Sequence, residues 1–144
     1  MARGIPSEVI RHFQSVPLFA QVHKRGLRAI VRAATEVDVP AGQVLVREGD
    51  HGRELYVIVR GTALVTRAGR KLRELIPGDY FGELAFLQPA PRSATVTAKS
   101  DMRVMVLDSR AMDVVVEEEP LIARRLLGTM AERLRQVERT SPTH

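Results

Sequence analysis

One segment of the sequence combines residue types that could bind an anion. FGELAFLQPAPRSATV, residues 81–96, is mostly apolar or small, yet it carries Glu83 and Arg92, nine positions apart. Arg92 presents a planar set of N–H donors that matches two phosphate oxygens at once, and Ser93 adds a hydroxyl donor. Gly82 lets a ligand approach the backbone where a short helical turn would begin and expose unpaired N–H groups. These residues predict a phosphate site.

Glu83 needs a separate explanation, because a carboxylate repels a phosphate. It fits beside Arg92 if the ligand also offers a hydroxyl donor close to the phosphate, as a ribose 2′-OH would. A nucleotide whose phosphate lies near its ribose meets both conditions. The alternative is a structural ion pair between Glu83 and Arg92 across a loop, and the spacing alone leaves both interpretations open.

The elements that must position this segment follow from hydrophobic periodicity. Between residues 5 and 34, apolar residues recur twice at helical spacing. Residues 35–108 form short β-type runs with Gly, Pro or Asp turns about every 8–12 residues. Helical spacing returns over 109–139, where Ser109 can cap the first helix and Gly128 weakens the last. We predict a mainly β fold, an antiparallel β-barrel or jelly roll (double-stranded β-helix), with flanking N-terminal and C-terminal helices.

Length and composition narrow the class of protein. A chain of 144 residues suits one domain, so we expect residues 1–144 to fold as a unit that ends in a frayed tail at 140–144. Cysteine is absent, which excludes a thiolate metal site and fits a reducing compartment. No window approaches the ~20 apolar residues of a membrane span. We expect a cytoplasmic protein with no membrane segment in this chain.

Charge and histidine placement argue against two further classes. The net charge of +5 raises the question of nucleic acid, but the densest basic cluster, residues 67–73, is expected at a solvated hairpin tip. Aromatic residues make up 4% of the chain, too few for the base stacking of single-strand binders. The histidines are scattered without metal-ligand spacing. We expect no enzyme, no metal, no cofactor and no nucleic-acid partner.

The segment 81–96 resembles the phosphate-binding cassette of the cyclic-nucleotide-binding domain family. That pattern reads F-G-E-[LM]-A, a short variable loop, then P-R-[SAT]-A-[ST]-V, and the spacing here agrees. Upstream turns at residues 40–42 and 77–79 are also similar, and the resemblance covers nearly the entire chain. Residues 88–90 depart from the small or Gly-containing loop common in the family, in a part of the pattern that varies.

The resemblance implies roles for the polar residues of the cassette, which begins at Phe81. Glu83 would hold the ribose 2′-OH, while Arg92 and Ser93 would hold the cyclic phosphate. Backbone groups of the neighbouring residues would assist: Gly82, Leu84, Ala85 and Ala94.

The resemblance also implies apolar contacts and a lid. Val65 and Leu72 match positions that contact the base and sugar, with plain core packing as the alternative for each. The closing helix over residues 109–139 resembles the family's lid helices, with Arg133 or Leu134 as candidates to cap the base. The alternative for Arg133 is a solvated side chain near a helix C-terminus.

We therefore expect a regulatory module that binds cyclic AMP, with cyclic GMP left open, and that moves its C-terminal helices on binding to act on an unidentified protein effector. One alternative is a transcription-regulator-like sensor that forms a homodimer through the C-terminal helix, along a seam of four apolar residues: Ile122, Leu126, Met130 and Leu134. Another is a regulatory domain cut from a larger channel, transporter or kinase-type protein. The starting Met and the extensions beyond the barrel favour a stand-alone protein.

Overall fold

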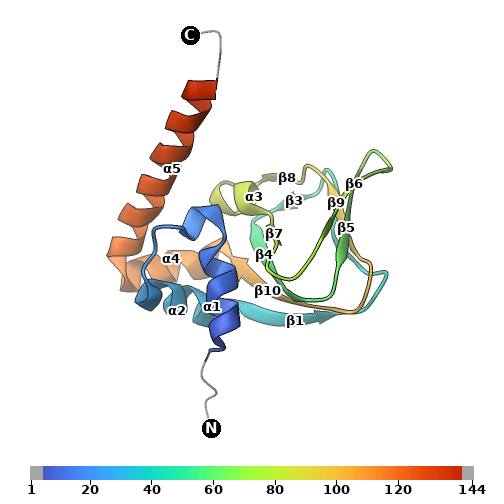
Figure 1. Ribbon diagram of the computed structural model, residues 1–144, viewed down its shortest axis with the longest axis horizontal. Coiled ribbons are helices and arrows are strands. Elements are labelled where there is room, and N and C mark those ends of the chain that lie inside the picture. The colour runs from blue at the N-terminus through green and yellow to red at the C-terminus, as the bar shows by residue number, and fades with distance from the viewer. Residues whose placement is uncertain (1–4, 141–144) are drawn as a thin grey trace.

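The computed structural model describes residues 5–140, apart from the side chains of Leu84, Arg133 and Thr140. In this structure the helices gather at one end of the molecule and the strands at the other (Figure 1).

The strands form two four-stranded sheets and a two-stranded ribbon, all with antiparallel pairs. The first sheet has the order β1 (Thr35–Val39), β10 (Met102–Asp108), β4 (Glu54–Arg60), β7 (Tyr80–Phe81). The second sheet has the order β2 (Val44–Val46), β9 (Thr95–Ala98), β5 (Ala63–Arg67), β6 (Arg70–Leu75). The ribbon pairs β3 (His51–Gly52) with β8 (Ala90–Pro91).

The helices come from both ends of the chain, with one short helix inside the β part. The N-terminal helices are α1 (Ser7–Gln14), the 3-10 helix η1 (Pro17–Phe19) and α2 (Lys24–Ala33). The short helix is α3 (Glu83–Leu87), and the C-terminal helices are α4 (Ser109–Glu118) and α5 (Pro120–Thr140). α5 packs against η1 and α4, and its far end leads away from the strands (Figure 1).

The first sheet is the middle layer of the molecule because its central strands are apolar on both faces. In β4, Leu55 and Val57 pack with the helices, whereas Ile58 packs with residues of the second sheet. In β10, Leu107 likewise packs with the helices, and Val104 packs with residues of the second sheet. Each face of the first sheet therefore has its own apolar partner, and this sheet lies between the two cores.

The predicted fold class is confirmed: antiparallel β structure with helices on either side in sequence. The strands lie in separate sheets rather than in one closed barrel. One local prediction is wrong, because Asp108, not Ser109, caps α4: the Asp108 carboxylate accepts the N–H of Arg110 at 2.6 Å. Ser109 is the first helical residue instead. α5 continues through Gly128 to Thr140, and residues 141–144 of the expected tail lie outside the described residues.

The apolar seam predicted for a homodimer is largely used within the chain. Ile122 is fully buried, and Leu126 and Met130 pack against the helical core. Leu134 alone among the four is well exposed, at 63%. The seam therefore anchors the first half of α5, up to Met130, to its own chain.

Candidate functional site

Residues 81–96 form one wall of a pocket of about 530 Å³, and β5 and β6 contribute to the opposite wall. Most of the predicted site residues line it: Val65, Leu72, Phe81, Gly82, Glu83, Ala85, Arg92, Ser93 and Ala94. A cavity of this size suits a small-molecule ligand. The fold thus brings together residues that lie up to 29 positions apart in the sequence (65 to 94).

Arg92 is a buried cation in this pocket, with 6% of its side chain exposed. Its Nη1 donates to the backbone oxygen of Glu54 at 3.1 Å, and its Nη2 lies 3.5 Å from Glu54 Oε2. Its guanidinium carbon is 5.8 Å from the centre of the Tyr56 ring, within the range of a cation–π contact. Because a guanidinium has five N–H donors in a fixed plane, it can bind an anion while it keeps such contacts.

Two glycines leave the space that Arg92 occupies. A Cβ on Gly52 would overlap the Arg92 guanidinium, and a Cβ on Gly82 would lie 2.7 Å from Arg92 Nη1. Gly82 also has a φ of +87°, a left-handed conformation that residues with a Cβ rarely adopt. The guanidinium therefore lies in a slot that larger residues would close.

Glu83, the first residue of α3, is also buried, with 7% exposure. Its Oε2 accepts the backbone N–H of Leu18 in η1 at 3.1 Å. Within the described part of the chain, the carboxylate that pairs with Arg92 belongs to Glu54. The alternative of a structural Glu83–Arg92 ion pair is therefore not what this structure forms, and Glu83 links the pocket wall to the helical end of the molecule.

The segment after Arg92 is tied to the second sheet. Ser93 and Ala94 line the pocket, and Arg67 Nε donates to the Ser93 backbone oxygen at 2.8 Å. Arg67 and Arg73 also line the pocket and are exposed. The β5–β6 hairpin thus adds positive charge at the rim, which favours an anionic ligand.

The apolar wall combines core packing with pocket lining. Val65 is 8% exposed and packs in the core of the second sheet, whereas Leu72 is 48% exposed. Phe81 stacks on Tyr56, with ring centres 4.6 Å apart. Burial, assisted by the nearby Glu54 carboxylate, raises the pKa of Tyr56 above its usual range, so its phenol stays neutral at physiological pH.

The remaining predicted residues are not placed at the pocket. Leu134 lies on the exposed part of α5 and does not line the cavity. The side chains of Arg133 and Leu84 lie outside the described residues, although the backbone of each is helical. Capping of a base by Arg133 thus stays a prediction.

Sequence reasoning missed several contributors to the site, among them Leu18, Gly52, Glu54 and Tyr56. Gly52 lies between two β-type runs, and nothing in the sequence signals its contact with Arg92. Glu54 and Tyr56 alternate with buried residues on β4, so their shared direction toward Arg92 was readable only once the strand was paired. No sequence pattern marks a backbone N–H such as that of Leu18.

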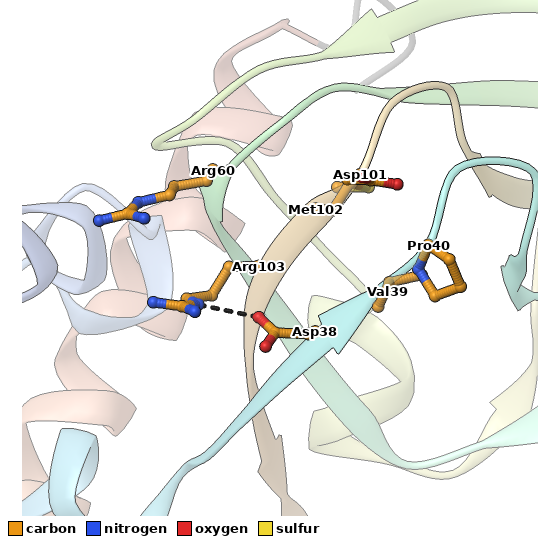
Figure 2. A pocket seen from close by; sticks show the side chains of 7 residues that line it. All are labelled: Asp38, Val39, Pro40, Arg60, Asp101, Met102 and Arg103. Atoms are coloured by element: carbon orange, nitrogen blue, oxygen red, sulfur yellow. Dashed lines mark hydrogen bonds and ion pairs between the residues drawn. The ribbon is translucent and has the colours of Figure 1, made fainter.

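A second arginine-lined cavity, of about 420 Å³, lies where the ends of β1, β4 and β10 meet (Figure 2). There Arg103 Nε lies 2.9 Å from Asp38 Oδ1 and 3.0 Å from Glu36 Oε1, and its side chain is 36% exposed. Arg60 and Asp101 also line this cavity. Across residues 5–140, no three His, Cys, Asp or Glu side chains gather as metal ligands would, and no helix is long and apolar enough to cross a bilayer.

Comparison with protein families gives a match that includes most of the strands and the whole cassette. A model of the family described as "Cyclic nucleotide-binding domain" matches residues 36–119. This range contains the pocket residues named above, from Val65 to Ala94.

Two curated relatives and one solved structure illustrate the range of similar proteins. A CRP-like cAMP-activated global transcriptional regulator of Mycobacterium tuberculosis is 31% identical over 83% of this chain and 55% of its own length. A cyclic nucleotide-gated potassium channel of Rhizobium etli is 34% identical over 92% of this chain and 39% of its own length. The N-terminal domain of a transcriptional regulator from Streptomyces coelicolor superposes with a TM-score of 0.85 at 29% identity, covering 92% of this chain and 99% of that domain. The chain therefore spans about half or less of the two curated relatives.

Proposed function

The chain belongs to the cyclic nucleotide-binding domain family, and we propose that it is a single-domain regulatory module that binds cyclic AMP in the pocket of about 530 Å³. The observation that carries this proposal is the placement of a buried cation and a buried carboxylate, Arg92 and Glu83, on the wall of one cavity. A ligand with an anion on one edge and a hydroxyl on the other satisfies both.

Each lining residue has a role in this proposal. Arg92 and Ser93 hold the cyclic phosphate, with backbone groups of Gly82, Leu84, Ala85 and Ala94 around it. Glu83 accepts the ribose 2′-OH. Val65, Leu72 and Phe81 contact the base and sugar, and Arg133 or Leu134 caps the base once α5 closes. The proposal assigns the chain no catalytic residue, metal or cofactor.

The Glu83–Leu18 hydrogen bond gives the pocket a route to the C-terminal helices. A ribose hydroxyl that donates to Glu83 shares the carboxylate with the Leu18 N–H and so weakens that hydrogen bond. Leu18 lies in η1, and η1 packs against α5. Ligand binding therefore favours a different placement of η1 and α5, which is a population shift driven by differential contacts. An unidentified cytoplasmic effector protein would respond to that shift.

A second candidate function, a sensor that forms a homodimer, is favoured by one observation. Leu127, Leu134 and Val137 on α5 are 71%, 63% and 63% exposed, at the i, i+7, i+10 spacing of a coiled-coil seam. This stripe shares only Leu134 with the predicted seam, whose other three members pack inside the chain. Sedimentation with and without nucleotide tests it, and a monomer in both conditions contradicts it.

Calorimetric titration with cyclic AMP, cyclic GMP and linear AMP tests the main proposal. We expect cyclic AMP to bind more tightly than linear AMP, because Arg92 and Glu83 lie on one short stretch of wall. The cyclic GMP titration measures how far the base is distinguished. Equal or absent heats for all three ligands would overturn the proposal.

A further inference from the structure

The anion-binding group of the pocket already has an anion beside it. Glu54 approaches Arg92 with its carboxylate, at 3.5 Å from Nη2, and with its backbone oxygen, at 3.1 Å from Nη1. We propose that the Glu54 carboxylate is an internal anion that competes with the ligand's phosphate for Arg92 and so excludes simple anions from the pocket. This inference rests on the proposed function, since it takes the occupant of the pocket to be a cyclic nucleotide.

Arg92 lies between two cavities, so an anion in either cavity can interact with the same guanidinium. It lines both the ligand pocket of about 530 Å³ and a smaller cavity of about 220 Å³. Glu54 lines the smaller cavity, and Glu83 lines the larger one. A phosphate that enters the larger cavity therefore meets a guanidinium that a carboxylate already approaches from the other side. The carboxylate weakens the field that the phosphate experiences.

The Glu54 carboxylate is not needed to hold Arg92 in place. The short contact of Arg92 is with the backbone oxygen of Glu54, which any residue at this position would supply. Tyr56 covers one side of the guanidinium, and Gly52 and Gly82 leave the slot in which it lies. The carboxylate, in contrast, is 3.5 Å away and its side chain is 30% exposed. Removing its charge should leave Arg92 where it is.

This arrangement discriminates between ligands by the number of contacts they make. A cyclic nucleotide that loses part of its attraction to Arg92 still gains the ribose contact at Glu83 and the apolar contacts of its base at Val65 and Leu72. Inorganic phosphate can contact Arg92 and Ser93 but has neither a ribose nor a base. An internal carboxylate therefore weakens both ligands at Arg92 but leaves only the nucleotide with enough other contacts to bind.

The test compares wild-type protein with Glu54→Gln and with Glu117→Gln, which removes the same charge from an exposed position on α4. Each is titrated with cyclic AMP by calorimetry, with and without millimolar inorganic phosphate, and thermal unfolding is recorded in parallel. We expect Glu54→Gln to bind cyclic AMP about fivefold more tightly, the upper range for a partly exposed ion pair. Inorganic phosphate should compete in Glu54→Gln and have little effect in the wild type or in Glu117→Gln.

Two outcomes would overturn the inference while the proposed function stands. Weaker binding by Glu54→Gln would make the carboxylate a positioning group for Arg92, and unchanged binding would show that it does not compete. If no variant bound a cyclic nucleotide, the proposed function would fail instead. The inference can also be tested without a cyclic nucleotide. Inorganic phosphate alone should raise the unfolding temperature of Glu54→Gln but not that of the wild type. An equal response of the two proteins would contradict the inference.

Discussion

Arg92 and Arg103 are both paired with carboxylates, yet the two arginines lie in opposite environments. Arg103 is 36% exposed on β10 of the first sheet, where Asp38 Oδ1 lies 2.9 Å from its Nε (Figure 2). Glu36 Oε1 lies 3.0 Å from the same Nε. Arg92 is 6% exposed inside the wall of a pocket, and its one carboxylate partner lies farther away, at 3.5 Å.

Under the proposed function, the contrast means that the arginine with the tighter ion pair is not the one that binds the ligand. An exposed arginine with close partners is screened by water and contributes little. A buried arginine with a loose partner keeps its attraction for an anion, because low exposure strengthens charge interactions. Arg92 is accordingly the residue to perturb first, and Arg103 is its natural control.

Replacing Arg92 should have the largest effect. We expect Arg92→Ala to weaken cyclic AMP binding by about 1.5–3 kcal/mol, the value of a charge-assisted hydrogen bond. Arg103→Ala, which removes a guanidinium of equal charge from the outer surface, should change affinity less than about twofold. Calorimetry on both variants checks this, and comparable losses in the two would mean that net charge rather than the Arg92 site attracts the ligand.

Gly52 offers a way to displace Arg92 without changing any charge. A methyl group at this position overlaps the guanidinium, so Gly52→Ala should weaken cyclic AMP binding by about tenfold, near 1.4 kcal/mol. Gly69 at the β5–β6 turn has a φ of +79° and open space around it. Gly69→Ala should therefore lower stability by about 1 kcal/mol and leave affinity unchanged. Denaturant unfolding measures the change in stability, and calorimetry measures the change in cyclic AMP affinity. Unaltered affinity in Gly52→Ala would show that binding does not depend on the space that Gly52 leaves for Arg92.

Glu83→Gln should have an intermediate effect. The amide keeps a hydrogen-bond acceptor but loses the charge, so we expect cyclic AMP binding to weaken by about 1 kcal/mol. The Leu18 amide reports directly on its hydrogen bond to Glu83. Its hydrogen exchange should speed up when cyclic AMP binds to the wild type and change less in Glu83→Gln. Slower exchange of this amide on binding would show that the ribose strengthens the contact between Glu83 and η1.

Acid should reveal the Arg103 pair, with the smallest effect. The hydrogen bond from Arg103, assisted by its charge, holds the pKa of Asp38 below its usual 3.8. Since the folded pKa is the lower one, this stabilisation is fully present above pH 3.8 and is lost as the pH falls through the lowered value. Asp38→Asn should therefore flatten the acid limb of the unfolding curve slightly, without altering ligand affinity at neutral pH. If Asp38→Asn left the acid limb unchanged, the Asp38–Arg103 pair would contribute nothing measurable to the stability of the fold.

The sequence predicted the pocket residues that belong to one continuous segment. It missed those that reach the pocket only because strands distant in the sequence pair. Glu83, Arg92 and Ser93 were found because they belong to one continuous segment with a recognisable spacing. Glu54 escaped notice because it contacts Arg92 only through the packing of a strand 38 positions away. Asp108 replaced Ser109 as the cap of α4 because helix boundaries shift by a residue with little change in pattern. The direction of α5 depends on contacts with η1 and α4, which periodicity does not specify.

The length of α5 turns a small change at its base into a large one at its tip. A helix of 21 residues is about 30 Å long, and this one is held near its start and extends past the other helices (Figure 1). A tilt of about 10° at the attached end would sweep the free end through about 5 Å, roughly the pitch of one helical turn. The displacement at the tip of α5 is thus set by the length of the helix, and removing residues after Leu134 would reduce it while keeping the residues proposed to cap the base.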